Sequence, residues 1–202
     1  LDRIHSMSDI EVILFGVVDA LFGTKDAISR VPEFVSRLHL PLCVGGGVSS
    51  TEDVDRVFGE GADRILLNSA LVKFPNVIEY AVSHYGAQAV VGHMQVYKYQ
   101  SDYNLMRWAG REGLGISVES YLMLVKDAGI KEVHISSVND DGMLCGWSLQ
   151  PLLERVLNAG LEVTVSGGFS SYEEQFSGNR PRGIALAAAF YRDNGFEGRN
   201  FV

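Results

Sequence analysis

Short apolar runs alternate with amphipathic stretches along this chain, and that alternation constrains the fold more than any other feature. The runs have the length of buried strands, and they are Glu11–Val17, Leu40–Val44, Arg64–Leu67, Ala89–Gly92, Glu132–Ser136, Leu161–Val165 and Gly183–Ala187. Between them, residues 51–59, 77–85 and 118–128 place apolar side chains at helical spacing. Repeated strand and helix predict a parallel sheet with helices outside it. The fold class we expect is α/β, a (β/α)8 TIM-type barrel that lacks one strand.

Glycines mark the ends of the predicted helices. Gly61, Gly86, Gly129 and Gly160 each follow a helix and precede a strand, as C-terminal caps do. Residues 95–115 lack helical spacing and contain alternating aromatics, so they predict a hairpin after the fourth strand of this chain. No linker or low-complexity stretch divides the chain, and we expect residues 1–202 to form a single domain.

Net charge limits the ligand classes. The formal net charge is −8 and the pI is near 5.1, which excludes a general attraction for nucleic acid or for an anionic membrane. An anionic ligand must therefore be held by local groups such as backbone N–H clusters. No run approaches the length of a membrane span, the N-terminus has no apolar leader, and Cys43 and Cys145 lie outside any CxxC pattern. We expect a cytoplasmic protein with reduced thiols.

One internal repeat points to anion binding. Residues 44–50 read VGGGVSS and residues 165–171 read VSGGFSS, each after a predicted strand and before an acidic helix start. The simplest interpretation is two half-barrels related by an approximate two-fold axis. Glycines at a strand end let backbone N–H groups approach an oxygen anion without obstruction from Cβ.

The repeat predicts two phosphate sites at the C-terminal ends of the strands. Their members are Gly46, Gly47, Asn68 and Ser69, and then Gly167, Gly168, Ala188 and Ala189. Two such sites suit a substrate with a phosphate at each end. The alternative for each copy is a tight strand-to-helix turn.

Polar residues beyond two other strands are candidates for acid–base chemistry. Asp141 lies in SSVNDDG, where a carboxylate can serve as acid or base, or can be solvated in an Asp-Gly turn. His93 and Gln95 share a parity past a buried strand, so both can face the barrel interior. His93 can act as a base, although we favour a polar residue in a solvated loop. His134 lies within a strand, which indicates a histidine with its hydrogen bonds satisfied.

Charged residues open several of the predicted strands. Glu11, Arg64 and Glu132 each stand at a strand start, and Asp63 precedes Arg64. Such residues are often solvated, but opposite charges at equivalent starts can also form a ring that closes the barrel bottom. The sequence has no HxH or HExxH spacing, and we predict neither a metal nor a cofactor.

Three long stretches resemble a known family, the cyclase subunit of imidazole glycerol phosphate synthase and its close paralogues. They are residues 40–91, which begin LPLCVGGGVSS, residues 115–149, which include KEVHISSVNDDGMLCGWSL, and residues 163–171, VTVSGGFSS. The segment VYKYQSDYNLMRWAG and the ending AAAFYRDNG are more similar to paralogues that accompany amidotransferases in surface-sugar biosynthesis.

The resemblance implies a (β/α)8 barrel that receives ammonia from a glutaminase partner. Its reaction splits and cyclises a phosphoribulosyl substrate into imidazole glycerol phosphate and an aminoimidazole carboxamide nucleotide. One phosphate would be bound by Gly47, Asn68 and Ser69. The other would be surrounded by Asp141, Gly142, Gly168, Ala188 and Ala189. The ammonia gate would include Glu11, Arg64 and Glu132, and Asp63 would contact the glutaminase.

Departures from the family pattern affect the chemistry. The chain starts in what resembles the helix after the family's first strand, so we expect that strand, its catalytic aspartate and the fourth gate residue to be absent. Gln95 stands where the second catalytic aspartate is expected, and an amide cannot shuttle protons as a carboxylate does. SVNDDGM replaces the usual Asp-Arg-Asp-Gly-Thr pattern, and a small hydroxyl residue expected near Ala189 is missing.

Three functions follow as hypotheses. The first is a cyclase-like synthase component beside a glutamine amidotransferase, which binds a phosphorylated ligand but has impaired cyclase chemistry. The second is a genuine histidine-pathway lyase that uses Asp141, and His93 in an altered role. The third is a non-catalytic barrel subunit. Because an open barrel exposes unpaired strand edges, we also expect either that the gap is filled by a homo-oligomer such as a dimer or by another polypeptide segment, or that the chain is poorly stable alone.

Overall fold

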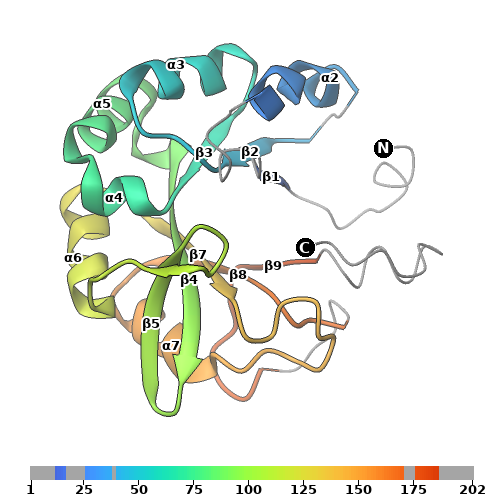
Figure 1. The fold of residues 1–202 in the computed structure, drawn as a ribbon, viewed down its shortest axis with the longest axis vertical. Helices are drawn as coiled ribbons and strands as arrows, with labels where there is room; N and C mark the ends of the chain where they lie inside the picture. Colours follow the sequence, from blue (N-terminus) through green and yellow to red (C-terminus); the bar gives the residue numbers. More distant parts are fainter. Residues whose placement is uncertain (1–11, 17–25, 38–39, 171–175, 187–202) are drawn as a thin grey trace. The chain divides into compact units, whose positions relative to one another are not determined.

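A computed structural model describes residues 12–16, 26–37, 40–170 and 176–186. The chain divides into two compact units. Unit 1 comprises Leu1–Gly92 with Met123–Lys131, and unit 2 comprises His93–Leu122 with Glu132–Val202. Figure 1 shows the elements of both units in chain order.

Unit 1 is built on parallel strands. β1 (Ile13–Gly16), β2 (Leu42–Gly45), β3 (Arg64–Leu67) and the start of β4 (Val90–Tyr99) pair in that order. Their register places Val44 beside Ile65, and Leu66 beside Val91. The connecting helical segments are η2 (Asp26–Arg30), α2 (Val31–Val35), α3 (Thr51–Gly59), α4 (Ser69–Lys73), α5 (Pro75–Tyr85) and η3 (Ala87–Ala89).

Local chemistry explains where α3 begins and how it packs. Ser50 caps the helix by accepting a hydrogen bond from Asp53 N (3.2 Å), while the Asp53 carboxylate accepts from Ser50 N (3.1 Å). The apolar face of α3 is buried, and its Asp55 carboxylate accepts hydrogen bonds from the hydroxyls of Tyr80 and Tyr85 on α5. The Asp55 hydrogen bond raises the pKa of Tyr85 to about 12. These contacts join α3 to α5.

Unit 2 contains the rest of β4, followed along the sheet by β7 (Glu132–Ser137), β8 (Glu162–Ser166) and β9 (Gly183–Ala185). The β7–β8 and β8–β9 pairs are parallel. β5 (Asp102–Arg107) turns back antiparallel on β4, and the short β6 (Glu112–Gly113) pairs with β5. The helices are α7 (Gln150–Asn158) and part of α6 (Val118–Asp127), which crosses the division between the units.

The predicted fold class is confirmed, because parallel strands alternate with helices as in a (β/α)8 TIM-type barrel. Each predicted apolar run overlaps a strand. The hairpin prediction is confirmed by the pairing of Gln95 with Met106 and of Tyr99 with Asp102. The fourth strand continues to Tyr99, beyond the predicted Gly92, because its outer half pairs with β5 from Gln95 onward. The single-domain arrangement stays a prediction.

The predicted helix ends are also correct in their backbone geometry. Gly61, Gly86, Gly129 and Gly160 all have positive φ, the left-handed conformation that ends helices. Across the described ranges, no helix is both long enough and apolar enough to cross a membrane.

Candidate functional site

In unit 1, the first glycine pair lies beside the end of the neighbouring strand. Gly46 and Gly47 follow β2, and both are exposed with φ values of 112° and 70°. Asn68 and Ser69 follow β3 and are half-buried. Because Gly45 pairs with Leu66 in parallel register, the two strand ends come to the same edge of the sheet. The structure therefore brings together the four residues predicted for the first phosphate site.

The helix start behind this edge is satisfied by the protein itself. The Asp53 carboxylate accepts hydrogen bonds from Ser49 N (2.8 Å), Ser49 Oγ (3.1 Å) and Ser50 N (3.1 Å). A carboxylate at this position neutralises the positive end of α3. An anion bound here must therefore use the glycine turn and the end of β3.

In unit 2, the second glycine pair is packed against the loop that follows β7. Gly167 and Gly168 follow β8 with φ values of 92° and 89°. A Cβ on Gly167 would lie 2.6 Å from Ser137 O, and one on Gly168 would lie 2.4 Å from Gly146 O. Gly146 N also donates a hydrogen bond to Gly168 O (3.0 Å). Close backbone packing therefore requires glycine here, in addition to any role in anion binding.

Asp140 holds this loop in place. Its Oδ2 accepts hydrogen bonds from Ser137 Oγ (2.6 Å), Ser148 N (2.9 Å) and Ser148 Oγ (2.8 Å). Asn139 pairs with the backbone of β4, because its Oδ1 accepts from Lys98 N (2.7 Å) and its Nδ2 donates to Lys98 O (3.2 Å). Of the two adjacent acidic residues in this loop, Asp140 therefore has a structural role, and its neighbour has a different environment.

That neighbour, Asp141, is exposed, as is Gly142. Asp141 makes no side-chain hydrogen bond to the described part of the chain, so its carboxylate is available to solvent or to a ligand. Gly142 has a φ of 73°, and a Cβ added to it would meet no atom within 4 Å. Ala188 and Ala189, predicted for the same phosphate site, lie outside the described residues.

A polar face runs along the strands of unit 2. His134 on β7 is 3% exposed, and its Nδ1 and Nε2 each lie 2.9 Å from a hydroxyl oxygen, of Thr164 and Ser166 respectively. The prediction of a satisfied strand histidine is confirmed. Burial lowers the pKa of His134 from 6.5 to about 4, so the imidazole is neutral at pH 7.

His93 belongs to the same face, which corrects its predicted place in a solvated loop. It lies in β4, where pairing with neighbouring strands continues past the apolar run. Its Nε2 is 2.9 Å from Ser136 Oγ, and its ring centroid is 5.4 Å from that of His134. Burial, with a smaller contribution from His134, lowers the pKa of His93 to about 3. A neutral imidazole with so low a pKa is a poor proton acceptor at neutral pH.

Gln95 lies two residues further along β4 and shares the face of His93. Its Oε1 is buried and has no hydrogen-bond partner among the described residues. Two neighbours in sequence, Met94 and Val96, are buried on the opposite face. The predicted common orientation of His93 and Gln95 therefore agrees with the alternation of burial along β4.

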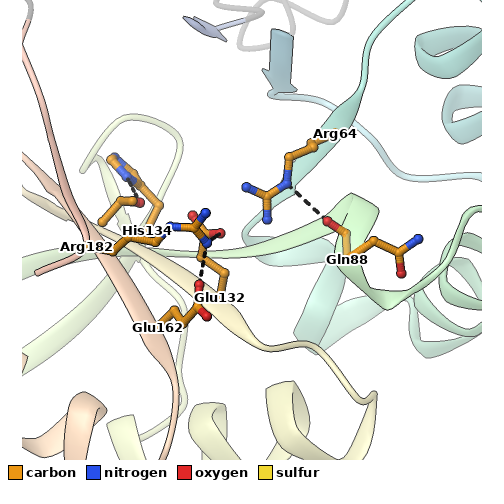
Figure 2. A network of polar contacts seen from close by, with 7 residues as sticks. Arg64, Gln88, Glu132, His134, Glu162 and Arg182 are labelled. Atoms are coloured by element: carbon orange, nitrogen blue, oxygen red, sulfur yellow. Dashed lines mark hydrogen bonds and ion pairs between the residues drawn. The ribbon is translucent and has the colours of Figure 1, made fainter. Parts of the chain in front are cut away.

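The strand starts carry the charged residues predicted for the ammonia entrance. In unit 1, Asp63 Oδ2 accepts a hydrogen bond from Leu42 N (2.8 Å), and Arg64 Nε donates to Gln88 O (3.1 Å; Figure 2). In unit 2, Glu132 is 7% exposed and lies 3.5 Å from Arg182 Nη1 (Figure 2). Glu11 lies outside the described residues.

Sequence reasoning missed several members of these clusters. Arg182 forms ion pairs with both Glu132 and Glu162 (Figure 2), yet it lies in a Pro-Arg-Gly segment with no strand pattern before it. Ser136 and Thr164 lie within predicted strands, on the same face of the sheet as His134, and Ser166 follows the end of its predicted strand on that face. Polar residues at alternate positions of an otherwise apolar strand were the signal that could have identified them.

Comparison with known proteins gives a consistent result. The family described as "Histidine biosynthesis protein" matches residues 4–195. The imidazole glycerol phosphate synthase subunit HisF of Sulfurisphaera tokodaii is 28% identical over 183 residues, which cover 91% of this chain and 74% of that protein. The HisF subunit of Metallosphaera sedula is 29% identical with the same coverage. That of Dictyoglomus thermophilum is 31% identical over 82% of this chain and 66% of its own length.

Replacing Gly168 should have two separate costs, one from the close packing around it and one from its positive φ. Gly168→Ala should lower the free energy of unfolding by about 3 kcal/mol or more, because its Cβ would meet Gly146 O in addition to the φ strain. Gly142→Ala is the matched control, since it has a similar φ and open space, and it should cost about 1 kcal/mol. Urea unfolding measures both changes. Equal losses would contradict the close packing of the loop against Gly168.

The buried histidines should make stability depend on pH. The folded pKa of His134, about 4, lies below the unfolded value near 6.5, so the unfolded state binds more protons as pH falls from about 6.5 toward 4. His134 alone should remove about 2 kcal/mol of unfolding free energy between pH 7 and pH 5. His134→Leu should reduce this dependence, whereas His84→Gln, on the exposed side of α5, should keep it. If the unfolding free energy of His134→Leu depended on pH as strongly as that of the natural chain, the lowered pKa of His134 would be refuted.

Proposed function

This chain belongs to the histidine biosynthesis protein family, and on that premise we propose that it is a HisF-like synthase component that works with a glutamine amidotransferase. In this proposal it binds a phosphorylated substrate at the C-terminal ends of its strands. The observation that carries the proposal is the geometry of the two glycine pairs. Each pair follows a parallel strand, and all four glycines have positive φ.

Backbone amides are the anion-binding groups in this proposal. With a net charge of −8, long-range electrostatics repel a phosphate. Consecutive left-handed glycines can turn N–H groups toward one point and so form a small anion-binding nest. In unit 1 this point is completed by Asn68 and Ser69 from the adjacent strand end. In unit 2 the proposed partners of Gly167 and Gly168 are Asp141, through a substrate hydroxyl, and the exposed turn at Gly142.

The partner proposal follows from the relatives. They are named as subunits of imidazole glycerol phosphate synthase, which supports a second subunit for this chain. By the family resemblance that subunit is a glutaminase, and ammonia enters past Arg64 and Glu132. Asp63 is proposed to contact it. The resemblance of the β4–β5 hairpin to surface-sugar paralogues favours a sugar-related phosphorylated substrate.

We propose altered cyclase chemistry because of the groups on β4. Gln95 cannot exchange a proton as a carboxylate does. His93 cannot easily replace it, because burial holds the pKa of its imidazole near 3. In the described loop after β7, Asp141 is an exposed carboxylate that remains available for acid–base work.

A genuine cyclase of histidine biosynthesis is the second candidate, favoured by the names of the relatives. It would turn over the phosphoribulosyl substrate with ammonium salts supplied directly, and Asp141→Asn would abolish that turnover. No turnover, in the natural chain and also in Gln95→Asp, would eliminate this candidate.

Phosphate binding can be tested in unit 1 with two glycines of nearly equal φ. Gly47 has a φ of 70° and lies at the proposed site, whereas Gly129 has a φ of 74° and follows α6. Gly47→Ala should weaken binding of ribulose 5-phosphate at least about fivefold, because a Cβ obstructs the approach of the anion to the backbone. Gly129→Ala should lose similar stability without losing affinity.

Isothermal titration calorimetry provides the affinities, and urea unfolding provides the stabilities. Equal affinities in the natural chain, Gly47→Ala and Gly129→Ala would reject the first glycine pair as a phosphate site. Failure of the natural chain to bind any sugar phosphate would reject the proposed function itself.

A further inference from the structure

The buried amide oxygen of Gln95 is not explained by contacts within the described part of the chain. The residue is half-buried, but its Oε1 is shielded from solvent and has no hydrogen-bond partner among the described residues. A buried acceptor without a donor costs about 1–3 kcal/mol relative to one that is hydrogen-bonded. Such a group is retained at a position where a ligand or an ordered water supplies the donor.

Gln95 lies at the same end of unit 2 as the second glycine pair. Val96 O accepts a hydrogen bond from Val138 N (2.9 Å), which fixes the level of β4 against the end of β7. The residue before Val138 is Ser137, the last residue of β7, and its backbone lies against Gly167. The Gln95 side chain therefore leaves β4 at the level where the loop after β7 and the turn after β8 meet.

The surroundings of Gln95 on this face are polar but uncharged. Toward the strand starts, the next side chains are His93 with Ser136, and then His134 with Thr164 and Ser166. Both imidazoles are neutral at pH 7, since burial lowers their pKa values to about 3 and about 4. Within the described residues, the ion pairs of this face are at the strand starts, around Arg182.

An uncharged polar face selects among ligand groups. The described strand residues next to Gln95 on this face carry no formal charge, so they offer a phosphate or a carboxylate no cation to offset its desolvation. The carboxylates of Asp140 and Asp141 belong to the loop after β7, and they disfavour an anion further. A hydroxyl or an amide N–H finds acceptors in Gln95 Oε1 and in the remaining lone pairs of the hydroxyls. His93 adds an imidazole nitrogen, since only its Nε2 is hydrogen-bonded to the described residues.

We propose that Gln95 is a specificity-determining residue whose amide accepts a hydrogen bond from a hydroxyl or N–H of the substrate's uncharged portion, next to His93. The inference rests on the proposed function, because a phosphate at the neighbouring glycine pair anchors the ligand whose uncharged portion reaches Gln95. It assigns recognition of a polyol or sugar phosphate, as opposed to a plain alkyl phosphate, to this side chain.

The test compares two ligands of similar size. Ribulose 5-phosphate carries hydroxyl donors, whereas butyl phosphate offers the same anion without them. The natural chain should bind ribulose 5-phosphate about tenfold more tightly, as expected for one or two well-placed hydrogen bonds. Gln95→Leu should lose most of that ratio through weaker binding of the sugar phosphate alone. Tyr99→Phe, at an exposed position of the same strand, is the matched control and should keep the ratio.

Stability separates recognition from a structural role. Because Gln95→Leu removes an unsatisfied buried acceptor, the unliganded variant should unfold at the same temperature as the natural chain or a higher one. A lower unfolding temperature together with loss of both ligands would identify Gln95 as structural and overturn the inference. An unchanged ligand ratio in Gln95→Leu would also overturn it, with phosphate binding intact. If the natural chain binds neither ligand, the proposed function fails, and this inference fails with it.

Discussion

Parallel strand pairing is the constraint on which the rest of this structure depends. The C-terminal ends of neighbouring parallel strands lie at the same edge of the sheet, so strand pairing alone brings together residues that are far apart in sequence. In unit 1 this brings the turn at Gly46 and Gly47 beside the end of β3. In unit 2 it brings Gly167 and Gly168 beside the loop after β7. The parallel register of the strands therefore determines which residues lie beside each glycine pair.

The two glycine pairs share a conformation but differ in packing. Gly46 and Gly47 are exposed, whereas Gly168 is buried against Gly146 and Asp140. A glycine can thus be required twice, by the positive φ and by the close approach of another backbone. The second pair allows close backbone packing in addition to its proposed role in anion binding. The loop after β7 is fixed by Asp140 and Asn139, and it leaves Asp141 exposed to solvent.

The buried polar side chains around His134 in unit 2 interact through hydrogen bonds between uncharged groups. Imidazoles and hydroxyls satisfy one another around His134, and the charges lie at the strand starts with Arg182. Such a face tolerates uncharged polar groups and disfavours ions. Together with Gln95 in place of a carboxylate, it supports the proposal that substrate recognition at this position differs from that expected for the cyclase.

The sequence predicted the strands, the hairpin and the glycine turns well, because apolar runs, aromatic alternation and Gly-Gly pairs depend mainly on local chemistry. It placed His93 in a solvated loop, because the apolar run ends at Gly92 and the sequence does not show that β4 continues without a break into the predicted hairpin. It did not identify the structural role of Asp140, because its partner Ser148 is fixed only when the loop folds back. Arg182 was missed for a similar reason, as its partners Glu132 and Glu162 belong to neighbouring strands.

The most direct test of the central claim is a phosphate titration followed by amide ¹H–¹⁵N nuclear magnetic resonance. The account predicts saturable shifts concentrated at the amides of Gly46 and Gly47 and of Gly167 and Gly168. Ser49 and Ser50 should change little, because Asp53 already accepts hydrogen bonds from their amides. Shifts that are absent from both glycine pairs, or that are confined to the start of α3, would contradict it.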